Sequence, residues 1–215
     1  MKKIFIFSLL LFCIMLFSVT ADNKNYEIFI DAEIRRIYLM QNGKAIKSYP
    51  CAVGKSSSPS PIGQFTVTLK EKWGEGFGGS FLGINCPWGK FGIHGTTHPE
   101  TIGLCASGGC IRMYNRDAAE LYNAVTIGTP VIIENGCFGA FGNGFRKITP
   151  DMYGSDLMAV QKRLADLGYY TGAIDGRYGV TTRSALHKYQ KDNGFTADDD
   201  ISIDIIKSMG FILME

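Results

Sequence analysis

The sequence predicts a mostly β domain followed by a small all-α domain of three helices. Segments rich in β-branched and aromatic residues, separated by turns, fill the chain up to about residue 135, which is typical of strands. Beyond residue 150, apolar residues recur at the spacing of amphipathic helices. A glycine-rich segment without charge, residues 135–145, separates the two patterns. A chain of 215 residues therefore suits two small domains.

Strands are expected where β-branched and aromatic residues cluster. Five such segments precede residue 135, namely 26–31, 34–40, 45–53, 65–69 and 131–134. Asn42-Gly43 is the dipeptide favoured in two-residue hairpin turns, so the second and third segments should form a hairpin. A short helix is expected over 115–123, where Asp117 lies near the start and the apolar face consists of Ala118, Leu121 and Tyr122.

Three helices are expected in the C-terminal region. Residues 156–167 place one apolar stripe on a helix that Gly168 ends, and the stripe consists of Leu157, Val160, Leu164 and Leu167. A second helix over 181–193 stops before Gly194, and a third covers 203–209. The expected domain spans residues 151–215. Its linker, 137–150, carries phenylalanines and should therefore pack on one of the domains.

The N-terminus resembles a secretory signal. Lys2 and Lys3 precede an uncharged apolar run over 4–19, and Val19 and Ala21 are the small residues that a signal peptidase accepts. Export with cleavage of residues 1–21 is expected, and an uncleaved membrane anchor is the alternative. Without this signal the chain carries as many acidic as basic residues, with no concentrated basic stripe, so nucleic-acid binding is excluded.

Five cysteines follow the signal: Cys51, Cys86, Cys105, Cys110 and Cys137. An odd number in an exported protein suggests one free thiol. The other four could form two disulfides in three pairings, or stay reduced in a host that lives without oxygen.

The segment 93–113 combines residues that suit nucleophilic catalysis; its sequence is IHGTTHPETIGLCASGGCIRM. His94 could take the proton of the Cys110 thiol, since the thiolate is the nucleophile. Gly108 and Gly109 allow a sharp turn whose amide groups point at an oxyanion. Arg112 offers a planar fork for a substrate carboxylate.

Two other interpretations compete with catalysis. A cysteine of an exported protein is usually a disulfide partner or a packed residue. His94, His98, Cys105 and Cys110 could also form a zinc site. The spacing argues against zinc, because Gly95, two threonines and Pro99 disfavour the helix that a histidine pair at i and i+4 needs.

Residues 26–134 resemble the L,D-transpeptidase (YkuD) catalytic domain. The resemblance is carried by residues 52–55 (AVGK), 58–65 (SPSPIGQF), 92–96 (GIHGT) and 107–113 (SGGCIRM). Many members have histidine where this chain has Gly108, which removes one polar contact. The resemblance implies a β-sandwich over residues 22–136. It also implies Cys110 as nucleophile and His94 as base, held by a carbonyl near Gly95.

The C-terminal region resembles a three-helix peptidoglycan-binding domain. The matching residues are Gln161, Leu164, Gly168, Asp175, Gly176, Tyr178, Gly179, Thr182, Ala185, Tyr189 and Gln190. By physical chemistry alone these positions describe a small helical bundle, so the binding assignment rests on the resemblance.

Together the two resemblances imply a wall-associated enzyme that forms 3→3 cross-links between peptidoglycan stems, without metal or organic cofactor. Backbone groups near Gly108, Gly109 and Cys110 would hold the oxyanion, and Arg112 and Ser107 would orient substrate or loop. Peptidoglycan stem peptides and glycan are the expected partners, and carbapenems the expected inhibitors. L,D-carboxypeptidation and non-catalytic wall binding are the alternatives. The glycine-rich segment 73–88 is either a surface loop with anchoring aromatics or a mobile lid over the acyl site.

Overall fold

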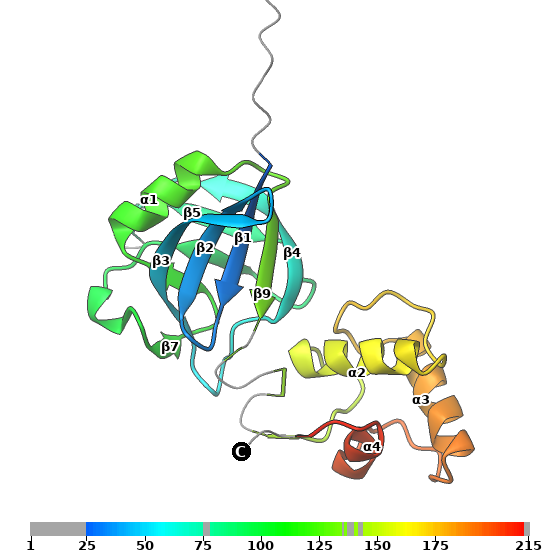
Figure 1. Cartoon of the computed structure of the whole chain (residues 1–215). Coiled ribbons are helices and arrows are strands. Elements are labelled where there is room, and N and C mark those ends of the chain that lie inside the picture. Colours follow the sequence, from blue (N-terminus) through cyan, green and yellow to red (C-terminus); the bar gives the residue numbers. More distant parts are fainter. Residues whose placement is uncertain (1–24, 75–77, 135, 137–139, 142–143, 213–215) are drawn as a thin grey trace, which may run out of the picture.

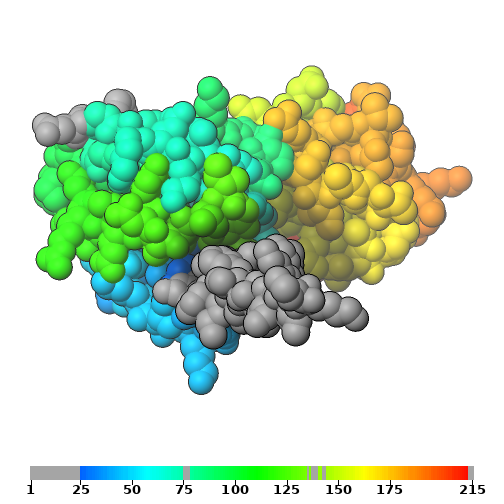
Figure 2. All heavy atoms as spheres, turned by 90° about the horizontal axis from the view of Figure 1, so that it is seen from above, coloured from blue at the N-terminus to red at the C-terminus, as the bar shows by residue number. Residues whose placement is uncertain are grey.

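The computed structural model describes residues 25–74, 78–134, 136, 140–141 and 144–212 (Figure 1). The expected signal, residues 1–21, and Cys137 lie outside these ranges. Strands fill the N-terminal part and helices the C-terminal part, and the two domains touch along one side (Figures 1 and 2). Within the described ranges, no helix has the length and apolarity to cross a membrane.

Nine strands form the β domain. They are β1 (Tyr26–Asp31), β2 (Arg36–Gln41), β3 (Lys44–Gly54), β4 (Gly63–Glu71), β5 (Phe81–Ile84), β6 (Phe91–His94), β7 (Cys105–Ser107), β8 (Ile111–Met113) and β9 (Pro130–Glu134). Their order is β2-β1-β9-β4-β5-β6-β8-β3-β7, and an additional β2–β3 pairing closes the sheet on itself. The mostly β fold class is confirmed.

Two long strands connect the layers of this closed sheet. The first part of β3 pairs with β2, whereas Cys51 and Ala52 pair with β8. In the same way β4 pairs first with β9 and then, past a register irregularity, with β5. The expected sandwich is therefore one continuous sheet that bends at β3 and β4, because strands with bulges can pass from one layer to the other.

The β2–β3 hairpin is the predicted one. Asn42 and Gly43 both have positive φ, 51° and 73°, and Gln41 pairs with Lys44, as in a type I′ turn. Inside the sheet lies an apolar core that includes Ile28, Ile93 and Leu121. Leu121 belongs to α1 (Asn115–Ala124), which matches the expected helix and packs beside β5 and β6.

The sequence did not indicate β5, β6, β7 and β8. These strands have three or four residues, which is too short to establish a period of two, and β5 shows no alternation because all four of its residues are buried. β5 also lies within the segment 73–88, so neither a surface loop nor a lid describes residues 81–84.

The α domain contains α2 (Ser155–Asp166), α3 (Val180–Asp192) and α4 (Ile203–Ser208) around a separate core. Gly168 and Gly194 end α2 and α3 with φ of 81° and 77°, as predicted. Leu167, expected on the buried stripe, is instead 39% exposed, because it caps α2 beyond the last helical turn.

The linker belongs to the packing of the α domain. Phe141 and Phe145 pack against its core, which confirms that the segment packs on a domain. Ile148 is fully buried and pairs with Ile201 through an isolated bridge.

The described cysteines limit the disulfides to fewer than two full pairs. Cys105 is disulfide-bonded, whereas Cys51, Cys86 and Cys110 are free. Burial raises the pKa of Cys51 to about 12 and that of Cys86 to about 11, so both remain inert thiols at neutral pH. Neither of the two alternatives left open for the other four cysteines, two disulfides or a fully reduced set, describes this state.

Candidate active site

Two neighbouring strands bring His94 and Cys110 to one pocket. β6 ends at His94 and runs parallel to β8, which begins directly after Cys110, with His94 opposite Arg112. A pocket of about 430 Å³ opens there. It is lined by Trp73, His94, Gly95, Thr96, Thr97, His98, Gly108, Cys110 and Arg112. Residues that lie 16 positions apart in the chain thus share one cavity.

The imidazole of His94 has a defined tautomer. Its Nδ1 lies 2.5 Å from the carbonyl oxygen of Gly95, and a carbonyl can only accept, so Nδ1 carries the proton. The lone pair of the neutral ring is then on Nε2, which is the arrangement of a general base. The carbonyl in contact with the ring is that of Gly95, where a backbone carbonyl was expected.

Aromatic and glycine contacts fix the position of this ring. Trp73 stacks on Phe81 with centroids 3.8 Å apart, and their rings lie 6.0 and 6.2 Å from that of His94. A Cβ on Gly95 would lie 2.4 Å from the oxygen of Gly78, so no side chain fits at this point beside the base. The N–H of Gly95 donates to the Ser80 carbonyl, so Gly95 contributes its carbonyl rather than an oxyanion donor.

Ser107 braces the nucleophile loop from inside. Its side chain is buried, and its hydroxyl donates to the Cys110 carbonyl at 2.6 Å while accepting from the Gly109 N–H at 3.0 Å. Of the two roles expected for Ser107, this geometry supports orienting the loop rather than binding substrate.

Replacing Ser107 by alanine should therefore lower the turnover number while leaving the fold intact. The Gly109 N–H would lose its acceptor, which costs about 1–3 kcal/mol of stability for a buried polar group. We expect a small decrease in melting temperature and a larger decrease in kcat than in substrate affinity. Ser184→Ala, at an exposed hydroxyl on α3, is the control. An unchanged kcat in Ser107→Ala would contradict the bracing role.

The same bonds narrow the choice of oxyanion donors. Gly109 has φ of 114°, and its N–H is already taken by Ser107. Its carbonyl accepts from Ser60, which also accepts from the N–H of Gly54. Of the three expected donors, Gly108 and Cys110 remain. Gly108 is exposed, and a Cβ built on it would meet open space.

Burial raises the pKa of the Cys110 thiol, whereas a backbone hydrogen bond near Gly92 and the charge of Arg112 lower it. The net shift is upward, so the thiol is protonated at neutral pH and needs His94 to remove its proton in the reaction. Below the pKa, the thiolate fraction rises about tenfold for each pH unit.

Alkylation of Cys110 should accordingly speed up continuously from pH 6 to pH 9. Iodoacetamide labelling followed by mass spectrometry measures this rate, with denatured protein as the reference thiol. A rate that is constant between pH 6 and 8 would instead show a preformed thiolate–imidazolium pair and contradict the raised pKa.

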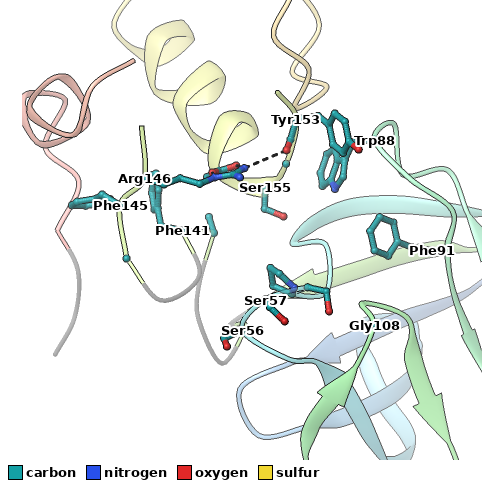
Figure 3. A pocket seen from close by; sticks show the side chains of 16 residues that line it. Ser56, Ser57, Trp88, Phe91, Gly108, Phe141, Phe145, Arg146, Tyr153 and Ser155 are labelled. Carbon is teal, nitrogen blue, oxygen red and sulfur yellow. Dashed lines mark hydrogen bonds and ion pairs between the residues drawn. The ribbon is translucent and has the colours of Figure 1, made fainter. Parts of the chain in front are cut away.

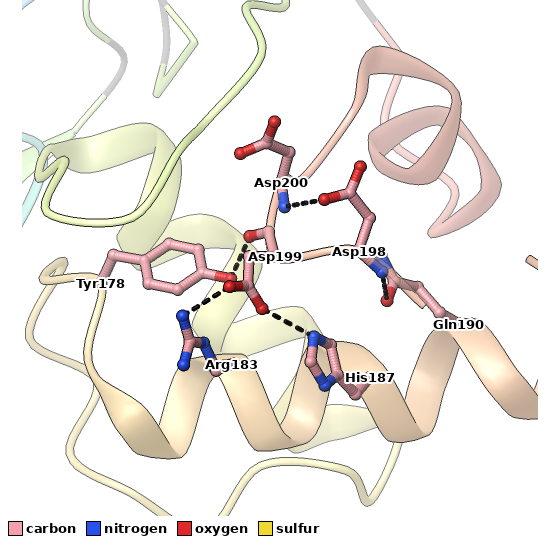
Figure 4. Close-up of polar contacts among 7 residues, drawn as sticks. All are labelled: Tyr178, Arg183, His187, Gln190, Asp198, Asp199 and Asp200. Carbon is pink, nitrogen blue, oxygen red and sulfur yellow. Dashed lines mark hydrogen bonds and ion pairs between the residues drawn. The ribbon is translucent and has the colours of Figure 1, made fainter. Parts of the chain in front are cut away.

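His98 and His187, the other two histidines, lie in different environments from that of His94. His98 lines the pocket but is exposed, and its Nδ1 lies 3.1 Å from Glu100. His187 lies on α3 in the other domain, where its Nε2 is 2.9 Å from Asp199 and Arg183 binds the same carboxylate (Figure 4). The expectation of a surface or packing role for His187 agrees with this ion-paired position.

The zinc interpretation loses its ligand set. Cys105 is in a disulfide and therefore offers no thiolate. Across the described part of the chain, no group of three His, Cys, Asp or Glu side chains could hold a metal ion.

Sequence reasoning missed two supporting residues. Asn115 accepts from the Thr96 N–H at 2.7 Å and thereby holds the turn after His94. Ser60 joins the end of β3 to the nucleophile loop. Ser60 belongs to the segment 58–65, which carries part of the family resemblance, but the sequence alone did not indicate its hydrogen-bond partners.

Comparisons with known proteins match both domains. The family described as "L,D-transpeptidase catalytic domain" (YkuD) matches residues 25–133, and the "Putative peptidoglycan binding domain" family matches residues 153–201. The proteins named "Putative L,D-transpeptidase YkuD" from Bacillus licheniformis and Bacillus subtilis are both 38% identical to this chain, over 113 and 109 residues. These alignments cover 52% and 50% of this chain, and 67% and 65% of the relatives. The chain thus spans about two thirds of the length of both relatives.

Solved structures of L,D-transpeptidases have lower sequence identity to this chain. The catalytic domain of an L,D-transpeptidase from E. faecium is 26% identical, with a TM-score of 0.45 over 52% of this chain and 98% of that domain. An L,D-transpeptidase from Mycobacterium smegmatis is 23% identical, with a TM-score of 0.45 over 52% of this chain and 59% of its own. The family match to half of the chain and the two Bacillus relatives decide the assignment, and the chain belongs to the L,D-transpeptidase (YkuD) family.

Proposed function

We propose that the protein is an exported L,D-transpeptidase that forms 3→3 cross-links between peptidoglycan stems. One observation carries this proposal: His94 presents a lone pair on Nε2 in the same pocket as the thiol of Cys110. The match of the C-terminal domain to a peptidoglycan-binding family supports the same polymer as substrate. The match of the catalytic domain to the L,D-transpeptidase family supports transfer of a peptide bond as the reaction.

The first half-reaction forms a thioester. Nε2 of His94 takes the proton from Sγ of Cys110, and the thiolate attacks the carbonyl carbon between the third residue and the terminal D-alanine of a tetrapeptide stem. Backbone N–H groups at Gly108 and Cys110 stabilise the negative oxygen. As the intermediate collapses, the C–N bond breaks and His94 returns the proton to the leaving amine of D-alanine.

The second half-reaction forms the cross-link. The side-chain amine of the third residue in a neighbouring stem gives a proton to His94 and attacks the thioester carbon. The C–S bond breaks, the thiolate takes the proton back, and an amide joins the two stems. The chemistry is a ping-pong acyl transfer that needs no metal or organic cofactor.

Arg112 is suited to bind a carboxylate of the stem at this site. It lines the pocket, is half-buried, and its guanidinium carries a permanent charge that matches a carboxylate in two-point geometry. A lysine at this position keeps the charge but loses the planar fork, whereas an alanine loses both. Comparing the two variants therefore separates the contribution of charge from that of geometry.

Replacing Arg112 by lysine should raise KM for the stem severalfold, and replacing it by alanine should raise KM further. Each charge-assisted hydrogen bond lost contributes roughly 1.5–3 kcal/mol. Steady-state kinetics on a soluble tetrapeptide measure the change, with Arg116→Ala, at an exposed position on α1, as the control. Equal KM values in the wild-type protein and in both Arg112 variants would contradict carboxylate binding by Arg112.

Product analysis tests transfer against hydrolysis. The protein is incubated with a tetrapeptide stem whose own side-chain amine is acetylated, with and without an acceptor stem that carries a free amine, and the products are separated by mass. Cross-linked dimers that form only with acceptor are the expected result. Release of D-alanine and a tripeptide alone, at the same rate in both cases, would overturn transpeptidation in favour of L,D-carboxypeptidation.

A further inference from the structure

A second and larger hollow lies between the two domains. It has a volume of about 600 Å³ (Figure 3). The β domain contributes the turn 56–59, Trp88, Phe91 and Gly108, and the other wall comes from residues 140–141, 144–146 and 153–156. Figure 3 shows the labelled side chains of both domains around this space. The hollow therefore exists only where the two domains meet.

Specific contacts hold the walls of this interdomain hollow in place. Arg177 donates from Nε to the Pro87 carbonyl at 2.7 Å, and the Ile62 N–H donates to the Ser155 hydroxyl at 3.1 Å. A Cβ on Gly176 would lie 2.7 Å from the ring of Trp88, so the indole packs directly on backbone. These two hydrogen bonds and the packing of Trp88 on Gly176 fix the position of one domain relative to the other.

The motif residues of the α domain serve this docking. The side-chain oxygen of Gln161 accepts from the N–H groups of Asp175 and Gly176 at 3.0 and 2.7 Å. Its amide nitrogen donates to the Arg177 carbonyl at 2.9 Å. Gln161 thus shapes the loop 175–177, which touches Trp88 and Pro87. The polar groups of Gln161 are thus engaged within the domain, which leaves the edge of the domain, where the hollow lies, as the place for a ligand.

The interdomain hollow borders the pocket of Cys110. Gly108 lines both spaces, and open space surrounds the direction in which its side chain would point. The turn 56–59 is tied to the same loop, since the Lys55 N–H donates to the Ser107 carbonyl at 3.1 Å and Ser60 donates to Gly109. A molecule in the hollow would thus lie directly beside the nucleophile loop.

The lining of the hollow suits an uncharged sugar. Arg146 is neutralised, because its Nε and Nη2 bind both carboxylate oxygens of the buried Asp156 at 2.5 and 3.2 Å. The other polar groups of the lining are serine hydroxyls, and its aromatic rings belong to Trp88, Phe91, Phe141, Phe145 and Tyr153. The C–H faces of pyranose rings stack on aromatic rings, and their hydroxyls bond to such groups. A stem peptide, with its carboxylates, would call for a cation that is not already paired.

We propose that this hollow binds the glycan strand of peptidoglycan, a chain of N-acetylated amino sugars, and thereby presents an attached stem to Cys110. The volume lies in the range of ligand sites, roughly 300–1,000 Å³. Tyr153 is 56% exposed and is the ring that is free to stack on a sugar. The delivery of the stem rests on the proposed transpeptidase function, whereas sugar binding does not.

The chain has two tryptophans, and each one lines a different space, so fluorescence can separate the two sites. In Trp73→Phe the remaining indole is Trp88. We expect a tetramer of β-1,4-linked N-acetylglucosamine to change its emission, and Tyr153→Ala to weaken this binding about three- to tenfold. Tyr38→Ala, which removes a tyrosine ring from the outer face of β2, should bind as Trp73→Phe alone does.

Three results of this titration would overturn the proposal. One is the absence of any emission change, and another is equal affinity with and without Tyr153. The third is a response of Trp88 to a sugar-free tetrapeptide but not to the sugar tetramer, which would make the hollow a stem site.

Kinetics then test the delivery of the stem. Tyr153→Ala should raise KM for a disaccharide-linked tetrapeptide severalfold and leave KM and kcat for the free tetrapeptide unchanged. Equal effects on both substrates, or none on either, would contradict the proposal. Should the wild-type protein turn over neither substrate, the proposed transpeptidase function fails, and the fluorescence titration still decides whether sugar binds.

Discussion

Replacing Cys110 by serine or alanine should reduce turnover of a tetrapeptide stem by on the order of 10⁴-fold or more, since removing a catalytic nucleophile removes the covalent route. Serine keeps the size of the side chain, but its hydroxyl is far less acidic than a thiol, so the neutral imidazole of His94 cannot activate it to the same degree. The measurement is release of D-alanine under saturating substrate.

The control for this prediction is a second free cysteine. Cys86 is buried, and its pKa is raised to about 11, so Cys86→Ala should retain turnover. Unfolding curves of all variants exclude loss of fold as the cause. Comparable losses in Cys86→Ala and Cys110→Ala would contradict the assignment of the nucleophile.

Replacing His94 by alanine should lower kcat by about 10²–10⁴-fold, the usual contribution of a general base. The loss follows from the geometry: Nδ1 is bound by the Gly95 carbonyl, and Nε2 is the nitrogen that can accept the thiol proton. The variant should still fold, because the half-buried ring packs at the edge of the core beside Trp73 and Phe81. Circular dichroism and a melting curve verify this point.

His187→Ala is the matched histidine control. His187 binds Asp199 in the α domain, so its loss should leave turnover of a free stem unchanged. Comparable losses in both histidine variants would overturn His94 as the base.

The sequence predicted most elements that have a local signal. The Asn42-Gly43 turn, α1 and the glycines that end α2 and α3 follow from backbone preferences of a few neighbouring residues. β5 was not predicted because all four of its residues are buried and show no alternation, and β8 because its three residues are too few to establish a period.

The residues of the site likewise fall into those that the sequence indicated and those whose roles depend on the fold. His94, Cys110 and Arg112 could be found from their spacing and residue types, since the chemistry depends on them directly. Ser107 and Asn115 act through hydrogen bonds to other segments, so their roles depend on the fold. The interdomain hollow could not be predicted either, because it arises from the docking of Gly176 and Arg177 against the β domain.

Covalent capture by a carbapenem tests the central claim most directly. The mature protein and its Cys110→Ala variant are incubated with the compound, and the intact masses are then measured. Acyl-transfer chemistry at Cys110 predicts one adduct on the wild-type protein, located on the peptide that contains Cys110, and none on the variant. An unmodified wild-type protein whose Cys110 is intact and reduced, or an adduct that persists in Cys110→Ala, would contradict the account.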